Sequence, residues 1–309
     1  MAEKMATRQA YGEALVELGA KNKDLVVLDA DLSKSTMTVK FSEAYPERFF
    51  NMGIAEQNMY GVAAGLAASG KTVVASTFAM FATGRAFEII RNAIGYPHLN
   101  VKICATHAGV TVGEDGATHQ AIADLAVMRE IPGMVVINPS DGVSAKKALK
   151  AAVEMEGPCY VRYGRASVPV VYDESLEFEI GKGILVKDGK DVSLIATGIM
   201  VNEAIKAAEI LEKEGISARV IDIHTIKPID EEIIVKAAKE TKGIVTCEEH
   251  TIIGGLGSAV AEVTAKKAPA KISMIGVKDR FGQSGKPDQL MKEYELTAED
   301  IVKAAKEIL

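Results

Sequence analysis

Long apolar runs are missing from this 309-residue chain, and their absence excludes whole classes of protein. No stretch of about 18 uninterrupted apolar residues occurs, so the sequence predicts no membrane-spanning helix and no membrane partner. The first eight residues, Met1 to Arg8, lack the apolar centre of a secretory signal. We therefore expect a cytoplasmic protein.

Cysteine and one-sided charge are also scarce. The three cysteines, Cys104, Cys159 and Cys247, form no CxxC pair, and the first two stand in apolar strand-like runs where cysteine behaves as a small hydrophobic residue. This use of cysteine agrees with a cytoplasmic location. The net charge of −6 is spread over interspersed acids and bases, so the composition predicts no nucleic-acid partner.

Short β-rich runs alternate with helical stretches along both halves of the chain, which predicts an α/β fold. We expect two consecutive domains, each a mostly parallel sheet flanked by helices: residues 1–168, a linker over 169–182, and residues 183–309. The predicted strands are 25–28, 72–77, 101–105, 134–138 and 160–163, then 192–196, 219–223, 243–247 and 272–277. The predicted helices are 57–68, 81–93, 120–129, 143–155 and 201–214, with two more that begin at Asp230 and Thr297.

A single carboxylate, Glu56, follows a Gly-Ile-Ala turn and begins a helix of small residues. An acid at a helix N-terminus is stabilised by the helix dipole whatever its function. The nearby Gly53, Gly61 and Gly65 leave space for a flat ligand, and a carboxylate can hold a proton on a ring nitrogen through a charge-assisted hydrogen bond. The segment therefore predicts a pocket for a heteroaromatic ring.

Two aromatic residues, Phe78 and Phe81, follow the strand predicted at 72–77. Three residues apart at the start of a helix, they share a face. Such a pair either fills core or forms a stacking wall for a ring. Because they come after Glu56 in a chain with only eight phenylalanines and no tryptophan, we favour the stacking wall.

The loop at 106–120 follows a predicted strand and holds three glycines, two acids and two histidines. Loops at the carboxyl ends of strands are where α/β folds place their chemistry. His107 and His119 can donate to a substrate oxygen or move a proton near neutral pH. Zinc binding is the alternative, but the chain contains no HExxH motif.

The Gly-Ile-Ala-Glu run at 53–56, the Ser-Thr-Phe run at 76–78 and the Gly-Glu-Asp-Gly-Ala-Thr-His-Gln run at 113–120 together resemble transketolase. The resemblance covers essentially the whole chain but only the C-terminal half of a full-length transketolase, its pyrimidine-binding and C-terminal domains. It implies binding of thiamine diphosphate and transfer of a two-carbon ketol group between sugar phosphates in the pentose phosphate pathway.

The same resemblance implies roles for single residues. Glu56 becomes the acid that activates the cofactor's aminopyrimidine. Arg165 becomes the clamp on the substrate phosphate, a task suited to its planar fork. The other implied cofactor-binding residues are Ile54, Phe78, Phe81 and Asp31. The other implied catalytic and substrate-facing residues are His107, Asp115 and His119.

Two positions depart from the family pattern: Gly84 stands where a third pocket aromatic is frequent, and Ala108 where a polar residue is common. The Gly-Asp-Gly…Asn motif that holds the diphosphate and Mg²⁺ or Ca²⁺ is missing altogether. The resemblance therefore implies a split enzyme, in which an N-terminal partner subunit binds the metal and the assembly is an α2β2 heterotetramer. This chain itself is expected to bind no metal and to be active only with that partner.

Other functions remain open at this point. The β-subunit of a 2-oxoacid dehydrogenase E1 shares the fold and the acid, and a 1-deoxyxylulose-5-phosphate synthase fragment is also close. A non-catalytic scaffold of the same fold is the alternative from a different class. In the second domain, Gly254 to Gly257 form a short glycine-rich run that we interpret as a turn, and the run Glu248-Glu249-His250 as an interface cluster without assigned chemistry.

Overall fold

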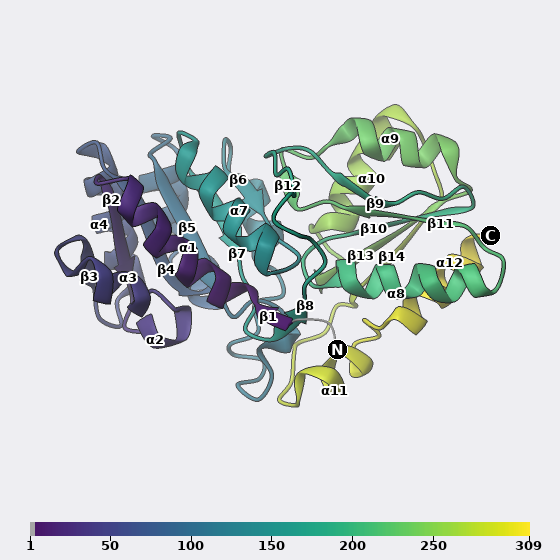
Figure 1. The fold of residues 1–309 in the computed structure, drawn as a ribbon, viewed down its shortest axis with the longest axis horizontal. Helices are drawn as coiled ribbons and strands as arrows, with labels where there is room; N and C mark the ends of the chain where they lie inside the picture. The colour runs from purple at the N-terminus through teal and green to yellow at the C-terminus, as the bar shows by residue number, and fades with distance from the viewer. Residues whose placement is uncertain (1–3) are drawn as a thin grey trace.

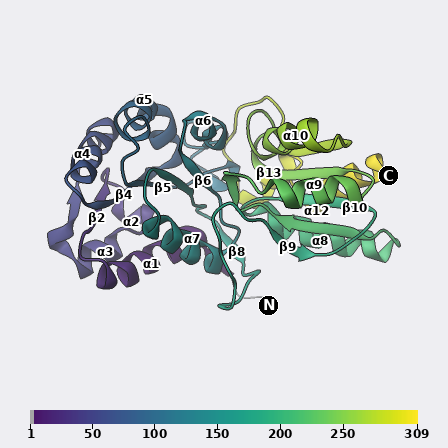
Figure 2. The same ribbon diagram turned by 90° about the horizontal axis from the view of Figure 1, so that it is seen from above.

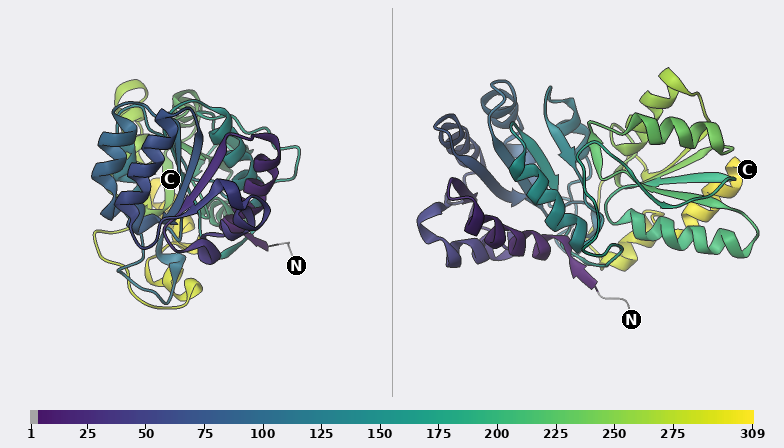
Figure 3. Two further views of the ribbon diagram at one scale, coloured as in Figure 1. Left: turned by 90° about the vertical axis from the view of Figure 1, so that its left-hand side faces the viewer. Right: turned by 45° about the horizontal axis from the view of Figure 1, so that its top comes forward.

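The computed structural model describes residues 4–309, which form two α/β units side by side along the longest axis of the molecule (Figure 1). Residues 1–3, with which the first domain is predicted to begin, lie outside the described residues. Two short strands, β1 (Lys4–Ala6) and β8 (Ser167–Pro169), form an antiparallel pair near the junction of the units. The right-hand view of Figure 3 shows the two units side by side, and in the left-hand view the first unit lies in front of the second.

The first sheet has seven strands in the order β12-β6-β7-β5-β4-β2-β3. All neighbours pair in parallel except β12, which runs antiparallel to β6. The strands are β2 (Leu25–Asp29), β3 (Phe49–Asn51), β4 (Thr72–Phe78), β5 (Val101–Thr106), β6 (Val135–Ile137), β7 (Cys159–Arg162) and β12 (Thr225–Lys227). The carboxyl ends of the parallel strands meet at one edge, where α/β proteins bind their ligands.

Helices cover both faces of this sheet, because neighbouring residues of each strand point to opposite faces and both sets are apolar. In β2, Val26 and Leu28 enter one core while Leu25 and Val27 enter the other. Figure 2 shows α4, α5 and α6 on one face and α1, α3 and α7 on the other. Their bounds, with that of α2, are α1 (Thr7–Lys21), α2 (Ser33–Thr36), α3 (Val39–Ala44), α4 (Glu56–Ala68), α5 (Phe87–Ile89), α6 (Asp124–Glu130) and α7 (Gly142–Glu154).

The second sheet has five strands in the order β14-β13-β10-β11-β9, and only β9 is antiparallel to its neighbour. Helices α8 and α12 lie on one face and α9 and α10 on the other, with α11 below the junction (Figure 1). The strands are β9 (Ile184–Lys187), β10 (Val192–Ala196), β11 (Ala218–Asp222), β13 (Ile244–Thr251) and β14 (Ile272–Val277). The helices are α8 (Met200–Lys213), α9 (Glu231–Glu240), α10 (Leu256–Lys267), α11 (Pro287–Glu293) and α12 (Ala298–Ile308).

The predicted α/β fold with two mostly parallel sheets is confirmed. The single helix predicted at 81–93 is wrong, because this stretch begins with a π-helical turn, Phe81–Arg85, continues as α5, and ends in a second π-helical turn, Ile90–Gly95. The helix predicted from residue 120 begins only at Asp124. Strand β12 was not predicted at all, although it joins the first sheet from the second half of the chain.

Candidate functional site

The sequence-predicted site residues gather along the carboxyl edge of the first sheet. Phe78 is the last residue of β4, His107 follows β5, and Arg165 follows β7. Glu56 is the first residue of α4, which packs beside β4. Three loops and one helix start therefore meet at the edge where a parallel sheet binds ligands.

Glu56 is buried, with 3% of its surface exposed, and its carboxylate is paired with a cation. Nη1 of Arg85 donates to Oε1 at 2.9 Å and to Oε2 at 3.0 Å. The Arg85 side chain is 52% exposed and its guanidinium lies 5.0 Å from the centre of the Phe81 ring. Sequence reasoning missed Arg85, because it lies 29 residues from Glu56 in a turn that was predicted as regular helix.

Four rings form a cluster next to this ion pair. Phe78 and Phe81 are stacked with centroids 5.9 Å apart, so the predicted pairing of these residues is present, although it spans a strand end and a π-helical turn. His107 stacks on Phe78 at 3.8 Å, and His119 meets Phe81 edge-on at 5.4 Å. Loop 106–120 thus brings both of its histidines to the aromatic pair.

His107 is held as a neutral imidazole. Burial, with the positive charges of Arg8 and Arg165 and with His119 nearby, lowers the pKa of His107 to about 3. Its Nδ1 lies 2.9 Å from the hydroxyl of Thr106. Near pH 7 this histidine can donate a hydrogen bond, but it does not change its charge, so only the donor part of its expected role fits the structure.

Two arginines converge beside His107. Arg165 donates from Nη1 to the carbonyl of Val112 at 2.7 Å and to Glu114 at 3.1 Å. Burial and the nearby Arg165 lower the pKa of Arg8, whose Nη1 donates to the carbonyl of Ser35 at 2.6 Å. Two neighbouring guanidinium groups attract an anion, which would compete with Glu114 for Arg165. Arg8 was missed in the sequence, since it stands 157 residues from Arg165 in a helix, α1, that was not predicted.

Asp115 and Asp31 lie at the same edge but outside the ring cluster. Asp115 is exposed on loop 106–120. Asp31 has φ of 64° and is fixed by Asn51, whose Nδ2 donates to its carboxylate at 2.9 Å. Ile54, just before Glu56, is 80% exposed, and an added Cβ at Gly53, Gly61 or Gly65 would meet nothing within 4 Å. The backbone at these three glycines therefore borders open space.

The glycine-rich run at 254–257 is filled by the protein's own carboxylate. Glu248 accepts the backbone N–H groups of Leu256 and Gly257 at 2.7 and 2.8 Å, at the start of α10. Its carboxylate takes the place that a phosphate has in a dinucleotide loop. Among residues 4–309, no three His, Cys, Asp or Glu side chains are grouped so that they could hold a metal ion, and no helix is long and apolar enough to cross a membrane.

Comparison with known proteins adds three findings. Residues 3–170 match the model of the transketolase pyrimidine-binding domain, and residues 181–301 that of the transketolase C-terminal domain. The chain is 56% identical to a putative transketolase C-terminal section of Methanocaldococcus jannaschii, covering 96% of this chain and 94% of that protein. It is 41% identical to a 6-deoxy-6-sulfo-D-fructose transketolase subunit of a Clostridium species, covering 97% and 94%.

A solved structure gives the same picture. The chain superimposes with a TM-score of 0.92 on a split-gene transketolase described as an inactive β4 tetramer. The two are 55% identical, and the match covers 99% of each chain.

Proposed function

Since this chain belongs to the transketolase family, we propose that it is the C-terminal subunit of a split, thiamine-diphosphate-dependent transketolase. The proposal is carried by the grouping of Glu56, the stacked rings of Phe78 and Phe81, and a neutral His107 at one edge of the first sheet. The partner subunit supplies the Gly-Asp-Gly…Asn motif for the diphosphate and its Mg²⁺ or Ca²⁺, since this sequence has no such motif.

The residues present suit the pyrimidine end of thiamine diphosphate. Glu56 holds a proton at a pyrimidine ring nitrogen, while Phe78 and Phe81 stack against the ring. Arg85 is paired with the Glu56 carboxylate in the structure, and its half-exposed side chain can move into solvent when the pyrimidine ring binds. Bound thiamine diphosphate supplies the carbon nucleophile for ketol transfer.

Loop 106–120 and the two arginines, Arg8 and Arg165, bind the sugar substrate. The neutral His107 donates to a substrate oxygen, His119 faces the same space, and Asp115 accepts from the hydroxyl next to the carbonyl carbon. Arg8 and Arg165 grip the terminal phosphate through charge-assisted hydrogen bonds. Each of these roles belongs to a residue of this chain, and each orients the substrate against the cofactor.

The substrate class is an anionic sugar, for which we propose sugar phosphates of the pentose phosphate pathway. A relative carries the name of a sulfonated sugar, whose terminal group is an oxyanion as well. A sulfonate bears one negative charge and a phosphate close to two near neutral pH. The same arginine pair can therefore serve either, and ketol transfer should be assayed with both kinds of donor.

The test is reconstitution. The isolated chain should fold but show no ketol transfer, because half of the cofactor site is missing, and its 55%-identical relative is described as an inactive β4 tetramer. Addition of a partner subunit with the Gly-Asp-Gly…Asn motif should give activity that depends on thiamine diphosphate, in an α2β2 assembly. Substantial transfer by this chain alone would refute the proposal.

A further inference from the structure

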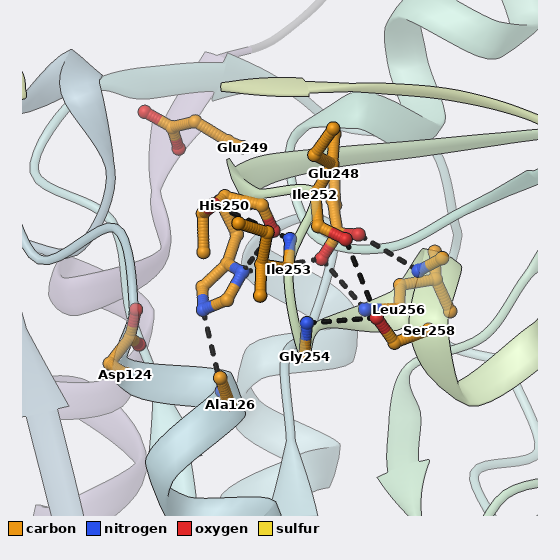
Figure 4. Close-up of polar contacts among 12 residues, drawn as sticks. Asp124, Ala126, Glu248, Glu249, His250, Ile252, Ile253, Gly254, Leu256 and Ser258 are labelled. Carbon is orange, nitrogen blue, oxygen red and sulfur yellow. Dashed lines mark hydrogen bonds and ion pairs between the residues drawn. The ribbon is translucent and has the colours of Figure 1, made fainter. Parts of the chain in front are cut away.

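Three consecutive buried residues, Glu248, Glu249 and His250, lie at the carboxyl end of β13, where the second sheet meets the first domain. Side chains of a strand alternate between its faces, so Glu248 and His250 lie together and Glu249 points the other way. The imidazole Nδ1 of His250 is 3.5 Å from Oε2 of Glu248. Figure 4 shows the Glu249 carboxylate directed away from that pair.

Glu248 and His250 satisfy backbone groups at helix starts. Glu248 accepts two N–H groups of α10, within its own domain. Nδ1–H of His250 donates to the carbonyl of Thr251 at 2.7 Å, while its Nε2 accepts the N–H of Ala126 in α6 at 3.4 Å (Figure 4). These contacts explain two of the three side chains as structural groups.

Glu249 reaches the loop that carries the substrate-facing residues. Its Oε1 accepts the backbone N–H of Thr111 at 2.6 Å, across 138 residues of sequence. A Cβ added at Gly109 would lie 2.2 Å from the Glu249 carboxyl carbon, so the carboxylate rests directly on the loop backbone. Gly109 and Thr111 follow His107 by two and four residues, and Asp115 comes four residues later.

The loop is bound to the second domain at another point as well. Nε2 of Gln120 donates to the carbonyls of Val110 and Gln283, at 3.0 and 2.9 Å. On the other side, the backbone carbonyl of Glu249 accepts from Nη2 of Arg162 at 2.9 Å. Glu249 therefore sits between the buried Arg162 and the loop, with its carboxyl oxygen on a backbone donor.

We propose that Glu249 is a positioning residue for ketol transfer: it holds loop 106–120, through the N–H of Thr111, in the conformation that presents His107 and Asp115. The second domain thereby sets the geometry of a site at the carboxyl edge of the first sheet. The effect on ketol transfer rests on the proposed function, whereas the effect on the loop does not. Loss of the contact leaves a buried N–H without its acceptor and releases the loop.

Two variants test the length of the Glu249 side chain separately from its charge. Glu249→Gln keeps an oxygen at the same distance from Thr111 but loses the charge, and Glu249→Asp keeps the charge but is one methylene too short. The matched control is Glu248→Asp, a buried carboxylate on the same strand, whose backbone N–H donors lie within its own domain. If Glu249 positions the loop, Glu249→Gln behaves like the wild type and Glu249→Asp does not.

Hydrogen–deuterium exchange of amides 107–116 measures how firmly loop 106–120 is held. Kinetics of the enzyme assembled with its partner subunit measure the effect on ketol transfer. We expect Glu249→Asp to speed exchange in the loop and to lower kcat/KM for ketol transfer about 10–100-fold, as small misplacements of reacting groups do. Exchange of the cofactor's C2 proton, which depends on Glu56, should stay near the wild-type rate. The control should change the melting temperature without a selective change in the loop.

Three results would overturn the inference. The first is unchanged loop exchange in Glu249→Asp, and the second is equal loop exchange in Glu249→Asp and Glu248→Asp. The third is faster loop exchange and lower kcat/KM in Glu249→Gln, with wild-type values in Glu249→Asp. The last pattern would show that the loop conformation depends on the charge beside Arg162 and not on the length of the side chain. Faster loop exchange with unchanged ketol transfer would support the contact but refute the proposed roles of His107 and Asp115. Absence of the Glu249 loop contact would therefore appear in the amide exchange, and failure of the proposed function in the ketol-transfer kinetics.

Discussion

Removal of the Arg165 guanidinium should weaken binding of sugar phosphates in particular. Nη1 of Arg165 already donates to Val112 and to Glu114, so an incoming phosphate has to replace the Glu114 carboxylate. A charge-assisted hydrogen bond contributes about 1.5–3 kcal/mol. The side chain is 38% exposed and solvent screens it, so the lower end of this range applies. Arg165→Ala should therefore raise KM about 10-fold, since 1.4 kcal/mol corresponds to a factor of ten.

The assay compares phosphorylated and unphosphorylated substrates in the assembled enzyme. Because the phosphate is remote from the reacting carbons, kcat should fall less than kcat/KM. Hydroxypyruvate, which has no phosphate, should scarcely respond. Arg129→Ala is the matched control, because Arg129 also donates to one carbonyl, that of Gly254 at 2.7 Å, and to one carboxylate, that of Glu262 at 2.9 Å.

Two outcomes would refute the phosphate clamp. One is an equal rise of KM for hydroxypyruvate and for a sugar phosphate, which would indicate a general loss of structure. The other is a KM for sugar phosphates that does not change. If Arg8 shares the same phosphate, the double variant Arg8→Ala/Arg165→Ala should also deviate from additivity, since both groups contact one ligand.

Two further predictions concern buried carboxyl groups. Glu56→Gln should keep the fold, because the side chains have nearly the same shape, but should slow exchange of the cofactor's C2 proton about 10²–10⁴-fold, as expected for loss of a proton-transfer group; near wild-type exchange would remove Glu56 from its role. Burial raises the pKa of Asp222 to about 7 from an ordinary value of 3.8. The raised pKa means that this group stabilises the fold below about pH 4 and that the contribution is lost as the pH rises to about 7. Asp222→Asn should remove this pH dependence, which is on the order of 2–3 kcal/mol between pH 5 and 7.5 in denaturant unfolding; identical slopes in both proteins would contradict the reasoning.

The sequence predicted those parts of the fold that local patterns determine. Each strand expected in the first domain is present within one residue at either end, because runs of apolar residues buried on both faces are distinctive. The two helices expected to begin at Asp230 and Thr297 are also present, with these residues as their N-caps. The failure at 81–93 has a local cause: π-helical turns contain one more residue than α-helical turns, and helical periodicity does not reveal them.

The candidate site was predicted only in part, for a different reason. Phe78 and Phe81 are three residues apart, and Glu56 precedes them in a short run that was itself recognised, so the grouping of these three residues was expected. Arg85 and Glu249 act through contacts that span 29 and 138 residues, which no local pattern encodes. The neutral state of His107 depends on burial and on two arginines from different segments, so it required the three-dimensional structure.

Strand β12 determines where this polypeptide can be divided. It comes from the second half of the chain, yet it pairs with β6 and forms the outer strand of the first sheet. One apolar core also runs without interruption from Leu28 in the first unit to Val260 in the second. A cut between the units would uncover the edge of β6, and uncovered strand edges recruit other chains.

The boundary between the two sequence families is therefore not a boundary of folding. The two units should melt in a single transition, since the first sheet takes β12 from the second half of the chain and the two units share one apolar core. A break of the chain between the two family matches, which end at residue 170 and begin at residue 181, would remove β12 from the first sheet, beside which α4 and Glu56 lie.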